Sequence, residues 1–206
     1  MAASGTVPDD LWNGVDSPAR RRLLTVGVEA FGERGFHGTT TRDIAGRAGL
    51  SPAALYVHYR TKELLLFDIS RVGHADALAT LERAADGVRE PVARITTMVG
   101  HFARWHAHHH ALGRVIHHEL PALTSEHFEE VAVIRRKTER AFRDTVESGA
   151  ASGVFRVDDV PDASLALMSL TIDICRWWGQ GRPRSPGRVA NHYAGLAVAM
   201  LGAGAK

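Results

Sequence analysis

The chain has 206 residues, of which 45% are hydrophobic and 23% are charged, and its formal net charge is +2. These values are ordinary for a soluble globular protein of one or two domains, and they do not by themselves indicate nucleic-acid binding. The single cysteine, Cys175, excludes an internal disulfide. Neither a secretion signal nor an apolar stretch of roughly 20 residues is present, so we expect a cytoplasmic protein with no membrane partner.

The first predicted helix has clear start and stop signals. Residues 1–16 are polar and are expected to form a flexible segment, whose one apolar pair is Leu11 and Trp12. Ser17 followed by Pro18 is typical of a helix N-cap and first helical position. Gly35 is expected to end the helix at about Arg34. Apolar residues recur at helical spacing between these ends, at Leu23, Leu24, Val28 and Phe31.

Two short helices are predicted next, over residues 41–48 and 52–59, joined by a turn that contains Gly49. Thr39 or Thr40 would cap the first of them, and Ser51 with Pro52 repeats the cap-plus-proline pattern. Two short helices joined by a three-residue turn with glycine are typical of a helix-turn-helix. Its expected apolar residues are Ile44, Ala45, Ala48, Leu50, Leu55 and Tyr59, with Phe31 and Phe36 closing the core.

Helical periodicity continues to the end of the chain, with prolines between the segments. The predicted helices cover residues 62–86, 91–108, 110–119, 124–150, 162–178 and 185–202. The one extended piece, residues 153–157, is too short to found a sheet. We therefore expect an all-α fold of about nine helices. It comprises a flexible segment (1–16), a three-helix helix-turn-helix head (17–65) and a helical body for ligand binding and dimerisation (66–206).

Positive charge is concentrated in the head. Residues 17–65 carry eight Lys and Arg residues against four acids, a net +4, whereas residues 1–16 carry −3. Such a cluster is the pattern expected of a phosphate-binding surface. The second helix of a helix-turn-helix enters the major groove, and its first residues here are small: Ser51, Pro52, Ala53 and Ala54. Side chains with donors suited to phosphate oxygens are Thr40, Thr41, Arg42, Tyr56, His58 and Lys62.

The runs Phe31–Ala45 (FGERGFHGTTTRDIA) and Ala48–Leu65 (AGLSPAALYVHYRTKELL) closely resemble the TetR family of bacterial repressors. The resemblance implies a homodimer whose last two helices form a four-helix interface, a ligand pocket in the body, and repression that ligand relieves. By position it implies phosphate contacts at Thr41, Arg42, Tyr56, His58 and Lys62, and base contacts at Ala53 and Ala54. A module that packs helices without touching DNA is the alternative.

The last two predicted helices carry apolar stripes suited to a two-fold contact. The expected interface residues are Leu165, Met168, Ile172, Val189, Tyr193, Leu196 and Met200. Burial inside the monomer is the alternative. A dimer would place two heads one turn of DNA apart, roughly 34–36 Å, on a palindromic operator in double-stranded DNA.

The body resembles, more loosely, the TetR branch that responds to acyl-CoA thioesters in fatty-acid and sterol catabolism. The matching pieces are His117–Leu123, Arg135–Lys137, Phe142–Arg143, Gly153–Phe155 and Trp177–Trp178. The predicted ligand pocket comprises Met98, Phe102, Trp105, Arg135 and Trp177, and the first three could equally be ordinary core. No cofactor is expected.

Seven of the twelve histidines lie within residues 101–118. His106 and His110 stand four residues apart, a spacing that can bind a metal on one helical face. A metal-sensing regulator using His101–His118, with Glu119 nearby, is therefore an alternative function. A metal-dependent enzyme is a weaker one, because no Gly-x-Ser-x-Gly, His-Glu-x-x-His or phosphate-binding glycine loop is present. A helical protein–protein adaptor is the third alternative, and it predicts no affinity for nucleic acid.

Overall fold

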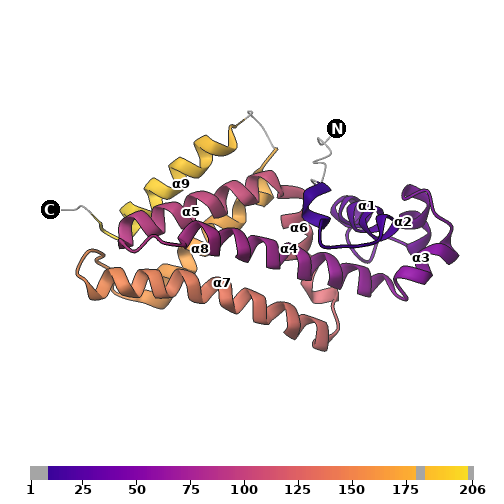
Figure 1. The fold of residues 1–206 in the computed structure, drawn as a ribbon, viewed down its shortest axis with the longest axis horizontal. Helices are drawn as coiled ribbons and strands as arrows, with labels where there is room; N and C mark the ends of the chain where they lie inside the picture. Colours follow the sequence, from indigo (N-terminus) through magenta and orange to yellow (C-terminus); the bar gives the residue numbers. More distant parts are fainter. Residues whose placement is uncertain (1–8, 180–183, 204–206) are drawn as a thin grey trace. The chain divides into compact units, whose positions relative to one another are not determined.

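The computed structural model describes residues 9–179 and 184–203, and its regular elements are all helical (Figure 1). The all-α prediction is therefore confirmed for this part of the chain. Within the described residues, two short 3-10 helices, η1 (Asp9–Trp12) and η2 (Leu120–Ala122), accompany nine α-helices. The α-helices are α1 (Pro18–Arg34), α2 (Thr41–Arg47), α3 (Pro52–His58), α4 (Lys62–Ala85), α5 (Pro91–His108), α6 (His110–His118), α7 (Ser125–Ala151), α8 (Val160–Trp177) and α9 (Pro186–Met200).

The predicted helix ends agree with these bounds to within about two residues, because local capping chemistry determines them. Ser17 accepts the N–H of Arg20 at the start of α1, and Gly35, with a φ of 70°, ends that helix. Thr40 caps α2 in a capping box with Asp43, whose carboxylate bonds back to the Thr40 N–H. No strand forms at the predicted extended piece within the described residues.

The chain forms two compact units. Unit 1 comprises residues 1–76 and 111–134, and unit 2 comprises residues 77–110 and 135–206. The helices α4 and α7 each contribute residues to both units. This division differs from the predicted boundary at residues 65 and 66, because 111–134 packs with the head.

Three contacts join residues 111–134 to the head within unit 1. Glu119 accepts the backbone N–H of Phe36 at 3.1 Å. The Glu63 carboxylate accepts the N–H of Thr124 at 3.0 Å and lies 2.7 Å from Nδ1 of His127. Side chains of α6 also pack closely against the backbone of α4 at a glycine, Gly73. The sequence offered no signal for these pairings, which link residues about 60 to 80 positions apart.

The segment before α1 is more ordered than predicted. Trp12 is only 1% exposed, and its indole N–H donates to the hydroxyl of Thr25 on α1 at 3.0 Å. The backbone carbonyl of Val15 accepts from the Arg21 guanidinium at 2.6 Å. A buried indole with a hydrogen-bonded N–H therefore anchors residues 11–16 to α1, a contact that the expectation of a flexible 1–16 segment did not include. Residues 1–8 lie outside the described part of the chain.

Unit 2 is built around α5. Helix α9 lies alongside α5 (Figure 1), and small residues allow the close approach, since a Cβ on Gly100 would meet Ala190 and Ala194 of α9. Helix α8 packs on α5 as well. The shared core is made of Ala103, Ala107, Ile174 and Val189. None of the helices in the described residues has both the length and the apolar composition needed to cross a membrane.

Candidate nucleic-acid interface and effector pocket

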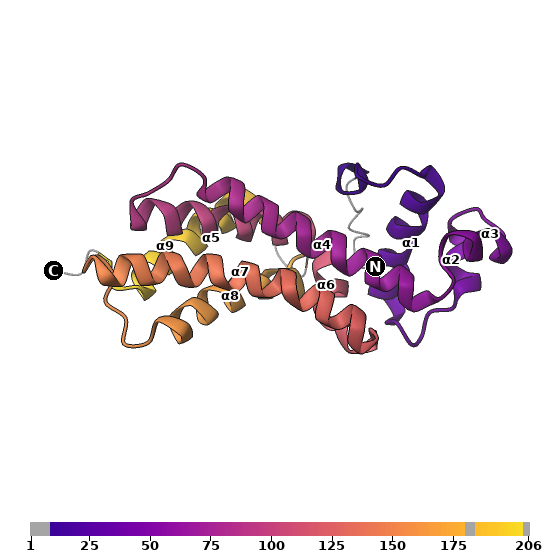
Figure 2. The same ribbon diagram turned by 60° about the horizontal axis from the view of Figure 1, so that its bottom comes forward.

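The helices α2 and α3 form the predicted helix-turn-helix (Figure 2). Gly49 in the turn has a φ of 67°, a conformation that glycine adopts without strain. The N–H of Leu50 donates to the carbonyl of Ala45 at 2.8 Å and fixes the turn. Ile44 of α2 and Leu55 of α3 are buried in the core of unit 1, as predicted. The opposite face of α3 is left to solvent.

Two of the predicted DNA-binding hydroxyls have structural partners. The Thr40 hydroxyl donates to the Asp43 carboxylate at 2.7 Å and accepts the Asp43 N–H. The Ser51 hydroxyl accepts the N–H of Ala54 at 3.1 Å. Both side chains therefore cap helices, which orients α2 and α3 whether or not they also touch phosphate.

The other predicted contacts lie at the surface of the head. Thr41 and Tyr56 bring their hydroxyl oxygens to 3.1 Å of each other, which links α2 to α3. Tyr56 is 48% exposed. Arg42, Pro52 and Ala53 are exposed, and Ala54 and His58 are half-buried. DNA contact by these residues stays a prediction.

Lys62 occupies a different environment from the other predicted phosphate ligands. Its ammonium donates to the backbone carbonyls of Phe36 at 2.6 Å and Thr39 at 2.7 Å, and it lies 4.1 Å from the Phe36 ring centroid. Burial lowers the pKa of Lys62, and the charge of Glu119 partly offsets that effect. Lys62 thus holds the loop between α1 and α2 to the start of α4.

Some of the arginines of the head are paired with acidic side chains. Arg47 pairs with Glu33 at 2.6 Å, and Arg34 lies 3.5 Å from Asp43. Arg42 and Arg60 are exposed and make no ion pair among the described residues. These two guanidinium groups are consequently the cations near α2 and α3 most available to a phosphate backbone.

The buried carboxylate of Asp68 links α1, the end of α3 and α4. Asp68 accepts from Arg20 at 2.6 Å, from Arg71 at 2.8 Å and from the Tyr59 hydroxyl at 2.8 Å. Burial would raise the pKa of Asp68, but the hydrogen bonds from Arg71, Tyr59 and Arg20 outweigh it and lower that pKa. Burial raises the pKa of Tyr59, which stays a neutral donor. This network fixes the end of α3 relative to α1 and α4.

One exposed residue of α3 is missing from the predicted set. Val57 is 81% exposed, more than any other large hydrophobic side chain in the described residues. It stands four positions after Ala53, so helical spacing alone would have placed both on one face.

Three of the residues predicted to line a ligand pocket lie on α5. Met98, Phe102 and Trp105 are buried in unit 2, where Phe102 packs on Phe142 and the Met98 sulfur accepts from Thr145. Burial is expected both of an internal pocket lining and of ordinary core, so the pocket residues stay a prediction. Burial lowers the pKa of Arg135 on α7. Of the predicted set, Trp177 alone is among the described residues that line a cavity beside α9.

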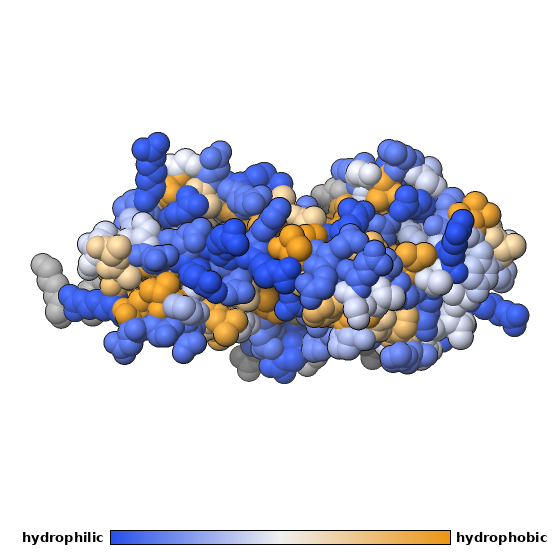
Figure 3. Space-filling model, turned by 90° about the horizontal axis from the view of Figure 1, so that it is seen from below, coloured by the Kyte–Doolittle hydropathy of each residue, from blue (hydrophilic) through white to orange (hydrophobic). Residues whose placement is uncertain are grey.

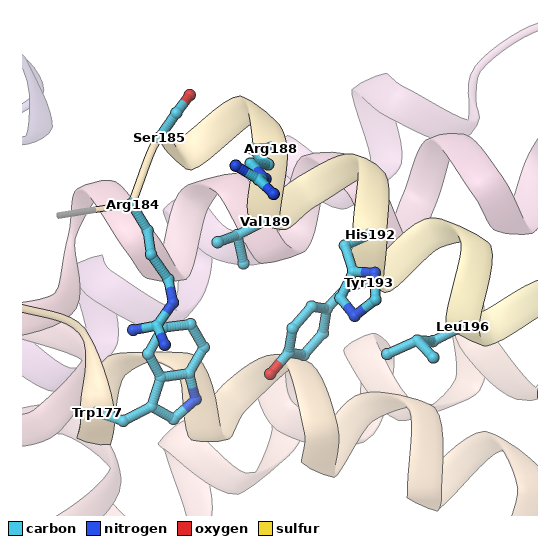
Figure 4. A pocket seen from close by; sticks show the side chains of 8 residues that line it. All are labelled: Trp177, Arg184, Ser185, Arg188, Val189, His192, Tyr193 and Leu196. Carbon is cyan, nitrogen blue, oxygen red and sulfur yellow. The ribbon is translucent and has the colours of Figure 1, made fainter. Parts of the chain in front are cut away.

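A cavity of about 780 Å³ lies beside α9 and the end of α8 in unit 2 (Figure 4). The Arg184 guanidinium lies over the Trp177 ring, 5.1 Å from its centroid. The ring centroids of Tyr193 and Trp177 are 6.4 Å apart. Arg188 and His192 project from α9, and no acidic residue is among the described residues that line the cavity. These are Trp177, Arg184, Ser185, Arg188, Val189, His192, Tyr193 and Leu196. Cations beside flat aromatic rings suit a ligand that is anionic and partly planar.

The predicted dimer residues divide between surface and core. Leu165 of α8 and Leu196 and Met200 of α9 are 40–49% exposed, as is Leu170, which was not predicted. Met168, Ile172 and Tyr193 are half-buried. Val189 is buried in the core of unit 2. Hydrophobic side chains reach the surface in the part of unit 2 that includes α7 and α8 (Figure 3).

The histidines near the end of α5 are tied to the backbone. His106 is fully buried, with Nδ1 2.9 Å from the carbonyl of Phe102, and His110 Nδ1 lies 3.1 Å from the carbonyl of Ala107. Over residues 9–179 and 184–203, no three His, Cys, Asp or Glu side chains are grouped to hold a metal. The metal-sensing and metal-enzyme alternatives therefore gain no support from the described residues.

A helix-turn-helix head with surface cations, joined by long helices to a helical unit with a cavity, defines a DNA-binding regulatory protein. Family models agree: "Bacterial regulatory proteins, tetR family" matches residues 23–69, and "Tetracyclin repressor-like, C-terminal domain" matches residues 88–201. The chain belongs to the TetR family, whose members are transcriptional regulators and not enzymes.

Similar proteins span nearly the whole chain. The transcriptional repressor KstR2 of Mycolicibacterium smegmatis is 28% identical over 189 residues, which cover 90% of this chain and 91% of KstR2. A crystal structure of a tetR-family regulatory protein from Rhodococcus RHA1 is 38% identical, with a TM-score of 0.87, covering 91% of this chain and 98% of that one. The structure of AibR with isovaleryl coenzyme A and operator DNA is 21% identical, with a TM-score of 0.78 and coverages of 86% and 97%, and so shows the fold alone.

Proposed function

We propose that this protein is a cytoplasmic, ligand-released transcriptional repressor that binds a palindromic operator as a homodimer. The observation that carries this proposal is the helix-turn-helix, with the exposed cations Arg42 in α2 and Arg60 shortly after α3. The KstR2 relative, named a repressor, supports the direction of regulation. In the dimer, the α3 helices of two copies enter successive major grooves roughly 34–36 Å apart.

A second copy of the chain is the partner we propose for α8 and α9. Leu165, Leu170, Leu196 and Met200 expose large apolar side chains on these two helices. Burying them against the same surface of another copy would remove apolar area from water, the main favourable term in association. Leu196 also lines the cavity, so the second copy would cover one side of it.

The effector we propose is an acyl-CoA thioester, bound in the cavity beside α9. Coenzyme A offers phosphates for Arg184 and Arg188, and an adenine that can stack on Trp177 or Tyr193. AibR, which shares the fold, was crystallised with isovaleryl coenzyme A. The apolar side chains of Leu196 and Val189 suit the acyl part.

The release step we propose is a shift between two conformations. Helix α4 begins in the head and ends in unit 2, so a ligand that biases its position in unit 2 also acts on the head. A changed spacing of the two heads would no longer match the operator. The ligand needs to favour the non-binding conformation by only a few kcal/mol.

Replacing Arg188 with alanine tests the effector site. We expect this variant to bind isovaleryl-CoA or a longer acyl-CoA about tenfold more weakly, since a charge-assisted hydrogen bond contributes about 1.5 kcal/mol. Isothermal titration calorimetry measures this, with free coenzyme A as a second probe. Arg104→Ala, at an exposed arginine of α5 that does not line the cavity, is the matched control. Equal affinities in both variants and the unmodified protein would exclude this cavity as the site.

A further inference from the structure

The outward side of α3 presents methyl groups where a base reader would be expected to present hydrogen-bonding groups. Leu55 points into the core and is 1% exposed, whereas Val57 is 81% exposed and Ala53 is exposed. Positions 53 and 57 are one helical turn apart and lie opposite Leu55. We call Ala53 and Val57 the methyl face. Hydrophobic surface is visible at the end of the picture where α3 lies (Figure 3).

The polar side chains near the methyl face in the sequence are not part of that face. The Tyr56 hydroxyl is held by Thr41 of α2 at 3.1 Å, and Arg42 and Arg60 are exposed on either side of α3 in the sequence. Lys62 is directed to the carbonyls of Phe36 and Thr39. The exposed cations thus suit the phosphate backbone, whereas the side chain of Val57 has no donor or acceptor.

An exposed valine by itself needs no explanation, because single apolar residues are common on protein surfaces. Val57 differs because it stands on the helix that a helix-turn-helix inserts into the major groove. There it would meet base edges rather than water. The one apolar group on those edges is the C5-methyl of thymine, since guanine, cytosine and adenine offer only hydrogen-bonding groups.

We propose that Val57, supported by Ala53, is a specificity-determining residue that reads the methyl group of a thymine in each operator half-site. The proposal rests on the operator-binding function above. The operator must therefore carry thymine at the position facing Val57. Cytosine or uracil there would leave the valine against a surface without the methyl.

The test uses an operator selected from random duplexes with the unmodified full-length protein. Each thymine is replaced in turn, symmetrically in both half-sites, by deoxyuridine, which lacks only the C5-methyl. We expect one position at which the replacement weakens binding about fourfold for each half-site, the value of one buried methyl group. With Val57→Ala, which lacks both γ-methyl groups, that position becomes insensitive to the replacement, while Val57→Thr, which keeps one γ-methyl group, retains part of the sensitivity.

Two controls separate this inference from the function on which it rests. Val133→Ala, at an exposed valine of α7, should leave the deoxyuridine profile unchanged. Val57→Ala should fold normally, because the site is exposed and alanine favours helix. Operator binding with no sensitive thymine, or a sensitivity that Val57→Ala retains, overturns the Val57 contact alone. Failure of the unmodified protein to select any DNA overturns the repressor function itself, and the inference with it.

Discussion

Replacing Asp68 with alanine is expected to lower the free energy of unfolding by about 3 kcal/mol. The substitution removes the acceptor of Arg20, Arg71 and the Tyr59 hydroxyl at once. Tyr59 is only 4% exposed, so its hydroxyl would lose a partner that water cannot easily replace. Urea unfolding followed by circular dichroism, at a fixed protein concentration, measures the change.

The control for this variant is Asp86→Ala. Asp86 is exposed after the end of α4, and we expect a change within about 0.5 kcal/mol there. A loss below about 1 kcal/mol in Asp68→Ala would show that the network contributes little to stability.

The pH dependence of stability gives a second readout of the same network. Since the folded protein lowers the pKa of Asp68, its contribution is fully present above the unfolded value of about 4 and is lost as pH falls through the folded value. The unmodified protein should therefore lose more stability than Asp68→Ala between about pH 5 and pH 2. Parallel curves for the two proteins over this range would contradict the assignment.

Replacing Lys62 with methionine is expected to lower the free energy of unfolding by about 2–3 kcal/mol, because this removes two charge-assisted hydrogen bonds to half-buried carbonyls. The loop between α1 and α2 would be held less firmly. Operator affinity would fall because the head is less well folded, not because a phosphate contact is lost. The slope of log K against log salt would stay close to that of the unmodified protein, because Lys62 is not expected to neutralise a phosphate.

Arg42→Ala is the matched comparison for Lys62→Met. Arg42 is exposed on α2, so its removal should leave stability within about 0.5 kcal/mol of the unmodified value. Affinity for all sequences should fall, and the magnitude of the salt slope should drop by about 1 for each phosphate that the variant no longer neutralises. A flattened slope with unchanged stability in Lys62→Met would make Lys62 a phosphate ligand after all.

Local chemistry explains which parts of the fold could be predicted. Serine–proline pairs, a threonine cap and glycines after helices set the ends of α1, α2 and α3, because capping depends on neighbouring residues. The buried residues of the head follow from helical spacing alone.

The structural features that could not be predicted depend on contacts between residues far apart in the sequence. Trp12 is anchored by Thr25, and residues 111–134 join the head through Glu119 and Glu63. Lys62 looks like any surface cation of a recognition motif until the Phe36 and Thr39 carbonyls are located. Arg184 lies over Trp177, and both Arg184 and Arg188 line one cavity, which only the folded chain shows. None of these pairings leaves a periodic signal in the sequence.

The most direct test of the account is the dissociation constant for a selected operator, measured with and without an acyl-CoA at two salt concentrations. We expect binding at least about 10³-fold tighter than to a scrambled duplex, and marked weakening between roughly 50 mM and 200 mM salt. Saturating acyl-CoA should weaken operator binding by about tenfold or more. Equal affinity for operator and scrambled DNA, or an operator affinity that no acyl-CoA changes, would contradict a ligand-released repressor.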